Sequence, residues 1–188
     1  NINQSKMTTL LETECLIIRS WMPDQDAEQV FEIYNDPEVI YFLGNAARPP
    51  SVEVQCQRLI DSLERSQIRK NSSGTWAIIE KDNTKIVGII MLSQLPDQNR
   101  MLTEDLEIGW HLGKFAWVKG YATEAGRAML DYSFNILNIP VIYAVVKPEN
   151  YASIRVTQRL DMEFLGRTTK YYGIELLLFH RKSNLINQ

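Results

Sequence analysis

The hydrophobic positions of the chain change their spacing several times, and each change predicts a new strand or helix. Residues 15–21 and 141–146 are apolar runs rich in β-branched side chains, which predict strands. Apolar residues recur at helical spacing in 27–34 and 52–63, which predicts helices. The predicted strands are 15–21, 75–80, 85–92, 106–112, 141–146, 163–169 and 174–181. Two further helices are predicted, one from Gly120 to about Leu137 and a short one after Asn150 that ends at Leu160.

The order of these elements is β-α-α-β-β-β-α-β-α-β-β, a run of hairpins followed by a β-α-β crossover. This order predicts an α/β (α+β) fold with a mixed, mostly antiparallel sheet of about seven strands and helices on both faces. Residues 10–182 are predicted to form a single domain between an N-terminal tail, 1–9, and a C-terminal tail, 183–188. The residues before Met7 lack the apolar core of a secretion signal.

Composition narrows the class of protein. The 188 residues are 45% hydrophobic and carry a formal charge of −3, so a general binder of nucleic acid is not expected. No apolar run is long enough to predict a membrane-spanning helix. Cys15 and Cys56 form no disulfide framework, which favours the cytoplasm, and with His111 and His180 they lack the spacing of a metal site.

Residues 107–129 are the stretch that carries most chemical information. They are predicted to form a strand, a loop containing Gly113 and Gly120, and the start of a helix. The free N–H groups and positive dipole end of a helix N-terminus bind anions, and small side chains there let a phosphate approach the backbone. Neither a Walker A loop nor a dinucleotide fingerprint is present. The alternative is an ordinary strand-to-helix turn whose glycines serve packing.

The segment Trp117-Val118-Lys119-Gly120-Tyr121-Ala122 resembles the pyrophosphate-binding loop of GNAT-superfamily N-acetyltransferases, in particular the RimJ/RimL branch. Three further stretches resemble that branch in the same order: 13–19, 35–39 and Asn150-Tyr151-Ala152-Ser153. The resemblance covers roughly residues 10–182. It implies that acetyl-CoA is the donor, that no metal is needed, and that two parallel central strands, 106–112 and 141–146, splay apart around the pantetheine arm.

The resemblance also implies which residues contact acetyl-CoA. Its pyrophosphate would lie on the backbone N–H groups of residues 118–123, and a strand N–H of Trp110 or His111 would stabilise the oxyanion. The expected donor-binding residues are Trp110, His111, Leu112, Trp117, Val118, Lys119, Gly120, Tyr121, Ala122, Thr123, Asn150 and Ser153.

Three residues are candidates for proton transfer. Glu107 lies where several relatives place a carboxylate base, although a solvated strand-end glutamate is the alternative. Relatives carry a tyrosine acid where this chain has Thr157, which leaves the Ser153 hydroxyl as the candidate acid, unless it serves only the helix start. His111 shares a strand face with Glu107 and is a second candidate base. Asp161 replaces the glycine that relatives place at the following helix exit.

The predicted reaction is direct transfer of acetyl from acetyl-CoA to a primary amine. The amine could belong to a protein N-terminus, a polyamine, an amino acid or an antibiotic. The alternative is a non-catalytic CoA-binding or interaction module of the same fold, which the missing tyrosine favours. Neither nucleic acid nor a membrane is an expected partner, and a homodimer is compatible with exposed strand edges.

Overall fold

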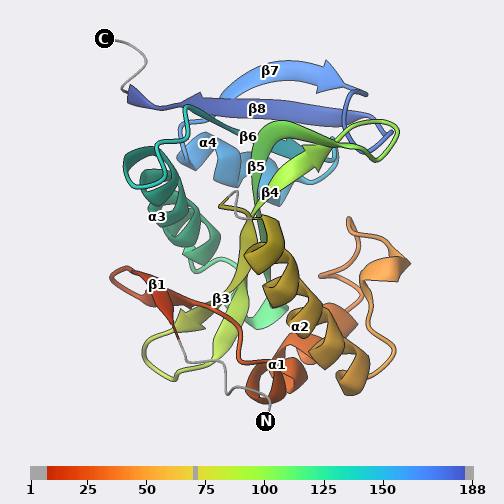
Figure 1. Cartoon of the computed structure of the whole chain (residues 1–188), viewed down its shortest axis with the longest axis vertical. Coiled ribbons are helices and arrows are strands. Elements are labelled where there is room, and N and C mark those ends of the chain that lie inside the picture. The colour runs from red at the N-terminus through yellow and green to blue at the C-terminus, as the bar shows by residue number, and fades with distance from the viewer. Residues whose placement is uncertain (1–7, 70–71, 185–188) are drawn as a thin grey trace. The chain divides into compact units, whose positions relative to one another are not determined.

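The computed structural model describes residues 8–69 and 72–184 (Figure 1). The chain divides into two compact units. The first unit comprises Asn1–Ile90 and Trp110–Ala125, and the second comprises Met91–Gly109 and Gly126–Gln188. The two predicted tails lie largely outside the described residues, and the predicted domain boundaries stay a prediction.

The described residues form an eight-stranded sheet in the order β1-β2-β3-β4-β5-β6-β8-β7. Strands β5 and β6 are parallel, whereas β1–β2, β2–β3, β6–β8 and β7–β8 are antiparallel, which confirms the predicted mixed, mostly antiparallel fold. The elements are β1 (Thr9–Glu12), β2 (Leu16–Arg19), α1 (Pro23–Asn35), η1 (Asn45–Ala47), α2 (Val52–Arg69), β3 (Gly74–Glu80), β4 (Ile86–Pro96), β5 (Leu102–Leu112), η2 (Lys114–Ala116), α3 (Tyr121–Asn135), β6 (Val141–Val146), α4 (Tyr151–Arg159), β7 (Glu163–Thr168) and β8 (Leu176–Lys182).

The first unit is built on β2 and β3, most of whose side chains between Leu16 and Arg19 and between Ala77 and Glu80 are buried. Leu16 and Ile18 on β2 and Ile78 on β3 are fully buried. The β2–α1 connection is tied by a buried ion pair, because Arg19 donates from both terminal nitrogens to the Asp26 carboxylate at 2.8 and 2.9 Å. These contacts fix the position of β2. The turn that precedes β2 anchors the N-terminus of α3.

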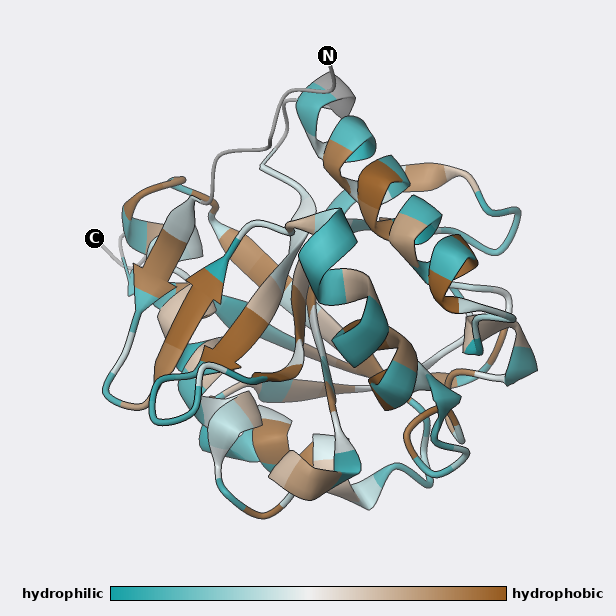
Figure 2. Cartoon of the chain, turned by 90° about the horizontal axis from the view of Figure 1, so that it is seen from below, coloured by the Kyte–Doolittle hydropathy of each residue, from teal (hydrophilic) through white to brown (hydrophobic). Residues whose placement is uncertain are grey.

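The second unit centres on β6 and β8, which pair over their whole length from Val141↔Lys182 to Val146↔Leu177. Ile142 and Ala144 on β6 are buried, as are Met129 and Leu130 on α3. The strands are largely hydrophobic and the helices alternate hydrophilic with hydrophobic bands, as Figure 2 shows. This pattern follows from the two periods, since a strand alternates faces and a helix buries one stripe.

Parallel pairing of β5 with β6 places Glu107 opposite Tyr143. The structure also has one strand more than the seven that were predicted, because β1 pairs with β2 and adds an edge to the sheet. Among the described residues, no helix is long and apolar enough to cross a bilayer.

Candidate active site

The loop between η2 and α3, in the first unit, exposes its backbone. Val118 has φ 60° and is fully exposed, and Gly120 has φ 78° with open space around the position of a Cβ. The first N–H groups of a helix have no acceptor within it. Across residues 8–69 and 72–184, no hydrogen bond is donated by the backbone N–H groups of 118–123. The loop therefore presents a row of free donors.

Thr123 adds a buried hydroxyl to the same helix end. Thr123 is 8% exposed, and its Oγ1 has no hydrogen-bond partner in the described part of the chain. A buried polar atom without a partner costs about 1–3 kcal/mol, and a water or a ligand group bound to the Thr123 hydroxyl would remove that cost. With the small Ala122 beside it, the loop has the free donors that a phosphate group would need, and phosphate binding by these residues stays a prediction.

The two lysines of the loop are already paired. Lys114 forms an ion pair with Glu38, and the Lys119 ammonium lies 3.5 Å from the Glu80 carboxylate. Because each positive charge has a nearby carboxylate, the attraction of this loop for an anion comes mainly from the N–H groups and the helix dipole.

Glu124 anchors the start of α3 to the turn before β2. Its Oε2 accepts hydrogen bonds from Thr13 Oγ1 at 2.6 Å and from the Cys15 N–H at 3.0 Å. Trp117, at the start of the loop, is held by its indole N–H, which donates to the Leu112 carbonyl at 3.1 Å. Glu124 was not predicted as an anchor from the sequence, although an acidic residue in the first turn of a helix is a signal for such a role.

His111, at the end of β5, is held by α1. Its Nδ1 lies 2.8 Å from the Tyr34 hydroxyl, and the two rings meet edge to face. Burial lowers the pKa of His111 to about 4. A histidine with this pKa is neutral near pH 7 and is a weak base there. The geometry therefore favours a structural role for His111 over the predicted alternative of a general base.

Glu107, in the second unit, is a buried carboxylate that receives two hydroxyl donors. It is 7% exposed, and the Tyr172 hydroxyl donates to its Oε1. The Ser93 hydroxyl is the second donor. Burial raises the pKa of Glu107 to about 7, while the two hydrogen bonds oppose that rise. The alternative of a solvated strand-end glutamate is excluded by this burial.

The α4 N-terminus accounts for two further candidates. Asn150 caps the helix, since its Oδ1 accepts the Ser153 N–H at 3.2 Å, and Ser153 is half-buried. Thr157 is fully buried and its hydroxyl donates to the Ile154 carbonyl at 2.6 Å. After the helix, Asp161 adopts φ 56° in place of a glycine. Aspartate tolerates this left-handed conformation, so the helix exit is retained.

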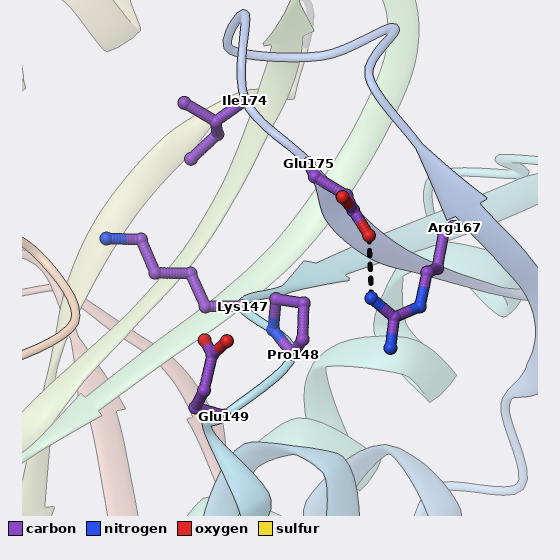
Figure 3. Close-up of a pocket in the computed structure, with 6 residues that line it drawn as sticks. All are labelled: Lys147, Pro148, Glu149, Arg167, Ile174 and Glu175. Carbon is purple, nitrogen blue, oxygen red and sulfur yellow. Dashed lines mark hydrogen bonds and ion pairs between the residues drawn. The ribbon is translucent and has the colours of Figure 1, made fainter.

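A hollow of about 310 Å³ lies at the end of β6, beside the β7–β8 connection. Figure 3 shows Arg167 and Glu175 joined across 2.7 Å, with the Lys147 side chain extending away from that pair. Arg167 is thus occupied by a protein carboxylate. The lining residues are Lys147, Pro148, Glu149, Arg167, Ile174 and Glu175.

The structure places the predicted residues in two groups. Trp110 and residues 111, 112 and 117–123 belong to the first unit, and Glu107, Asn150 and Ser153 belong to the second. Neither Tyr172 nor Ser93 was found from the sequence, because nothing in their local pattern indicates contact with Glu107. In the described ranges, no three metal-binding side chains come together.

Comparisons with known proteins identify the family. A family profile described as "Acetyltransferase (GNAT) domain" matches residues 16–163. The uncharacterized N-acetyltransferase p20 of Bacillus licheniformis is 29% identical over 161 residues, which cover 86% of each chain. The chain belongs to the GNAT family of acetyltransferases.

Two solved structures share the fold. The microcin C7 self-immunity acetyltransferase MccE, in complex with acetyl-CoA and AMP, superposes with a TM-score of 0.74 at 16% identity and covers 90% of this chain and 93% of its own. The ribosomal L7/L12 α-N-protein acetyltransferase RimL, in complex with coenzyme A, has a TM-score of 0.76 at 12% identity, with coverages of 94% and 99%. At these identities the likeness concerns the fold.

Proposed function

We propose that this protein transfers the acetyl group of acetyl-CoA to the α-amine of a peptide or protein N-terminus. The observation that carries this proposal is Glu107, a buried carboxylate with a pKa of about 7. A general base is most effective when its pKa lies near the working pH. An α-amine has a pKa of about 7.7–8.0, against about 10.4 for lysine. Glu107 is therefore matched to an α-amine far better than to a lysine.

The proposed step is a direct displacement. The amine nitrogen attacks the thioester carbonyl carbon, and the ionised Glu107 takes one N–H proton. A C–N bond forms as the C–S bond breaks, and the thiolate of CoA leaves and takes a proton from Ser153, the proposed acid, which regains a proton from solvent. The products are the N-acetylated amine and CoA, and Glu107 releases its proton to solvent.

Acetyl-CoA is the donor substrate in this proposal, and the α3 loop would hold its diphosphate. Support comes from the free N–H groups of 118–123 and from the unpartnered Thr123 hydroxyl, both within the described part of the chain. Oxygen atoms of a diphosphate accept several hydrogen bonds at once, which suits this row of donors. The proposed contacts of Trp110, His111, Leu112, Trp117, Asn150 and Ser153 with the donor, the homodimer and the cytoplasmic location stay predictions.

The name of RimL refers to an α-N-protein acetyltransferase of ribosomal L7/L12. That description agrees with an α-amine acceptor here, although at 12% identity it supports no particular protein substrate. The pKa match at Glu107 is the stronger argument.

The test is acetyl-CoA-dependent turnover on a panel of amines. The panel contains peptides with a free α-amine, the same peptides with a blocked N-terminus and an internal lysine, spermidine and an aminoglycoside. We expect release of CoA thiol with the free α-amine peptides and little with the blocked ones. Preference for spermidine or the aminoglycoside would overturn the substrate class. Binding of acetyl-CoA without turnover on any amine would instead support a non-catalytic CoA-binding module, which the buried Thr157 favours.

A further inference from the structure

The connection between β7 and β8 carries two adjacent residues in left-handed backbone conformation. Tyr172 has φ 59° and Gly173 has φ 69°. A bulky non-glycine residue rarely adopts a positive φ, and such strain persists only where surrounding contacts over-determine it. The Tyr172 N–H donates to the Pro96 carbonyl at 3.1 Å, which is one of these contacts. The strain at Tyr172 therefore needs further support from its neighbours.

Tyr171 and Lys170 provide that support. The Tyr171 hydroxyl donates to Asp105 Oδ2 at 2.6 Å, and the Lys170 ammonium lies 3.4 Å from the same oxygen. Tyr171 also forms an isolated antiparallel bridge with Asp97, and it is 2% exposed. The connection is thus fastened at several points to the β4–β5 hairpin, all within the second unit.

This fastening directs the Tyr172 hydroxyl at Glu107 Oε1. Tyr172 is 45% exposed as a whole, but desolvation and the neighbouring Glu107 carboxylate raise its pKa far above the ordinary value of 10. The phenol therefore keeps its proton and acts only as a donor. Asp105 precedes Glu107 by two positions on the same strand face, with Lys170 against it. Ser93 from β4 and Tyr143 from β6, which lies opposite Glu107, are both uncharged.

We propose that Tyr172 is a positioning residue for Glu107: its hydroxyl holds Oε1 and so fixes the orientation in which the carboxylate takes a proton from the amine. This inference rests on the proposed function, in which Glu107 is the base. The strained conformation at Tyr172 is explained by the same role, because this geometry brings the hydroxyl to the carboxylate.

The experiment compares two variants that each lose one phenol hydroxyl from the same turn. Tyr172→Phe removes the donor to Glu107, and Tyr171→Phe removes the donor to Asp105. Loss of one hydrogen bond to a charged group changes its ionisation constant about tenfold. We expect the acidic limb of kcat/KM to move up by about one pH unit in Tyr172→Phe. Turnover should fall about 10-fold below pH 7 and recover above pH 8. Tyr171→Phe keeps the backbone bridge to Asp97 and the Tyr172 N–H bond to Pro96, so it should keep the wild-type limb.

A second readout does not depend on turnover. Carbon-13 NMR of labelled glutamate carboxyls follows the ionisation of Glu107 directly, with Glu107→Gln assigning its resonance. A higher pKa of Glu107 in Tyr172→Phe alone supports the inference. Equal Glu107 pKa values in wild type and Tyr172→Phe would overturn it. If the wild type acetylates no amine but the pKa of Glu107 still rises in Tyr172→Phe, the proposed function fails while the contact between the two side chains stands.

Discussion

At the scale of single residues, Glu107 combines an unfavourable burial with a useful basicity. The carboxylate loses hydration, and the hydroxyls of Tyr172 and Ser93 restore part of that loss. Burial raises the free energy of the ionised carboxylate relative to its protonated form, and this favours the transfer of a proton from the substrate to Glu107. Removing the charge should therefore stabilise the fold while it abolishes the base.

Glu107→Gln should raise the free energy of unfolding at high pH. A carboxyl whose pKa is raised from 4.5 to about 7 in the folded state costs stability as pH rises through that window. The cost approaches about 3 kcal/mol above pH 7, because each tenfold change in an ionisation constant corresponds to about 1.36 kcal/mol. Urea unfolding at pH 4.5 and pH 8 measures the difference, which should appear only at pH 8.

The matched control is Glu104→Gln, an exposed position on the same strand. It should change stability little at either pH. A Glu107→Gln protein no more stable than wild type at pH 8 would contradict the raised pKa.

The position of Glu107 in the predicted strand identified it as a candidate base. The sequence did not predict that its side chain is buried. No residue between Lys170 and Gly173 carries a sequence signal for contact with residue 107, since the two segments lie far apart in the chain. Their contact is made by folding, and so the pKa of Glu107 was beyond prediction.

At the scale of elements, the η2–α3 loop should be sensitive to any side chain at Gly120. Gly120→Val should lower acetyl-CoA affinity at least about 10-fold, because it fills the open space over the backbone N–H groups and strains a residue with φ 78°. Isothermal titration calorimetry with acetyl-CoA measures this effect.

Gly44→Val provides the control for strain alone. Gly44 has φ 84° and also lies in open space, but it is outside the loop. Both variants should lose similar stability, and only Gly120→Val should lose affinity. Equal affinities in the two variants would show that the diphosphate binds elsewhere.

The elements themselves were predicted unequally. The boundaries of β6 were predicted residue for residue, because its apolar run is bounded by Pro140 and the turn after Val146. The β4–β5 hairpin was predicted too short, since β4 continues to Pro96 beyond the predicted strand 85–92. β5 also begins earlier than predicted, at Leu102. β1 was missed, since four residues such as Thr9–Glu12 form a strand only when β2 pairs with them.

At the scale of the whole molecule, two buried titratable groups act on stability in opposite directions. Glu107 costs stability as pH rises from 4.5 to about 7. His111, whose pKa is lowered from 6.5 to about 4, costs stability as pH falls through that window, because the folded state resists its protonation. The two trends offset each other in the wild type.

Single variants should expose each trend. Between about pH 4.5 and 6.5, the stability of Glu107→Gln should rise with pH, because this variant keeps the contribution of His111 and loses that of Glu107. Over the same range the stability of His111→Asn should fall with pH, because this variant keeps the contribution of Glu107. Thermal unfolding of both variants and the wild type across this range tests the prediction. Parallel profiles in all three proteins would contradict it.

Local pattern in the chain was sufficient to predict the mixed sheet and the order of most elements, and the resemblance of four stretches predicted the family, while phosphate binding by 117–123 stays a prediction. The sheet and its elements depend on periodicity and on neighbours in the chain, which the order of residues displays directly. Folding alone decided that Lys114 and Lys119 are paired, that His111 is neutral beside Tyr34, and that Tyr172 reaches Glu107. Burial and contacts between distant segments set charge and basicity, and these quantities exist only once the chain has packed.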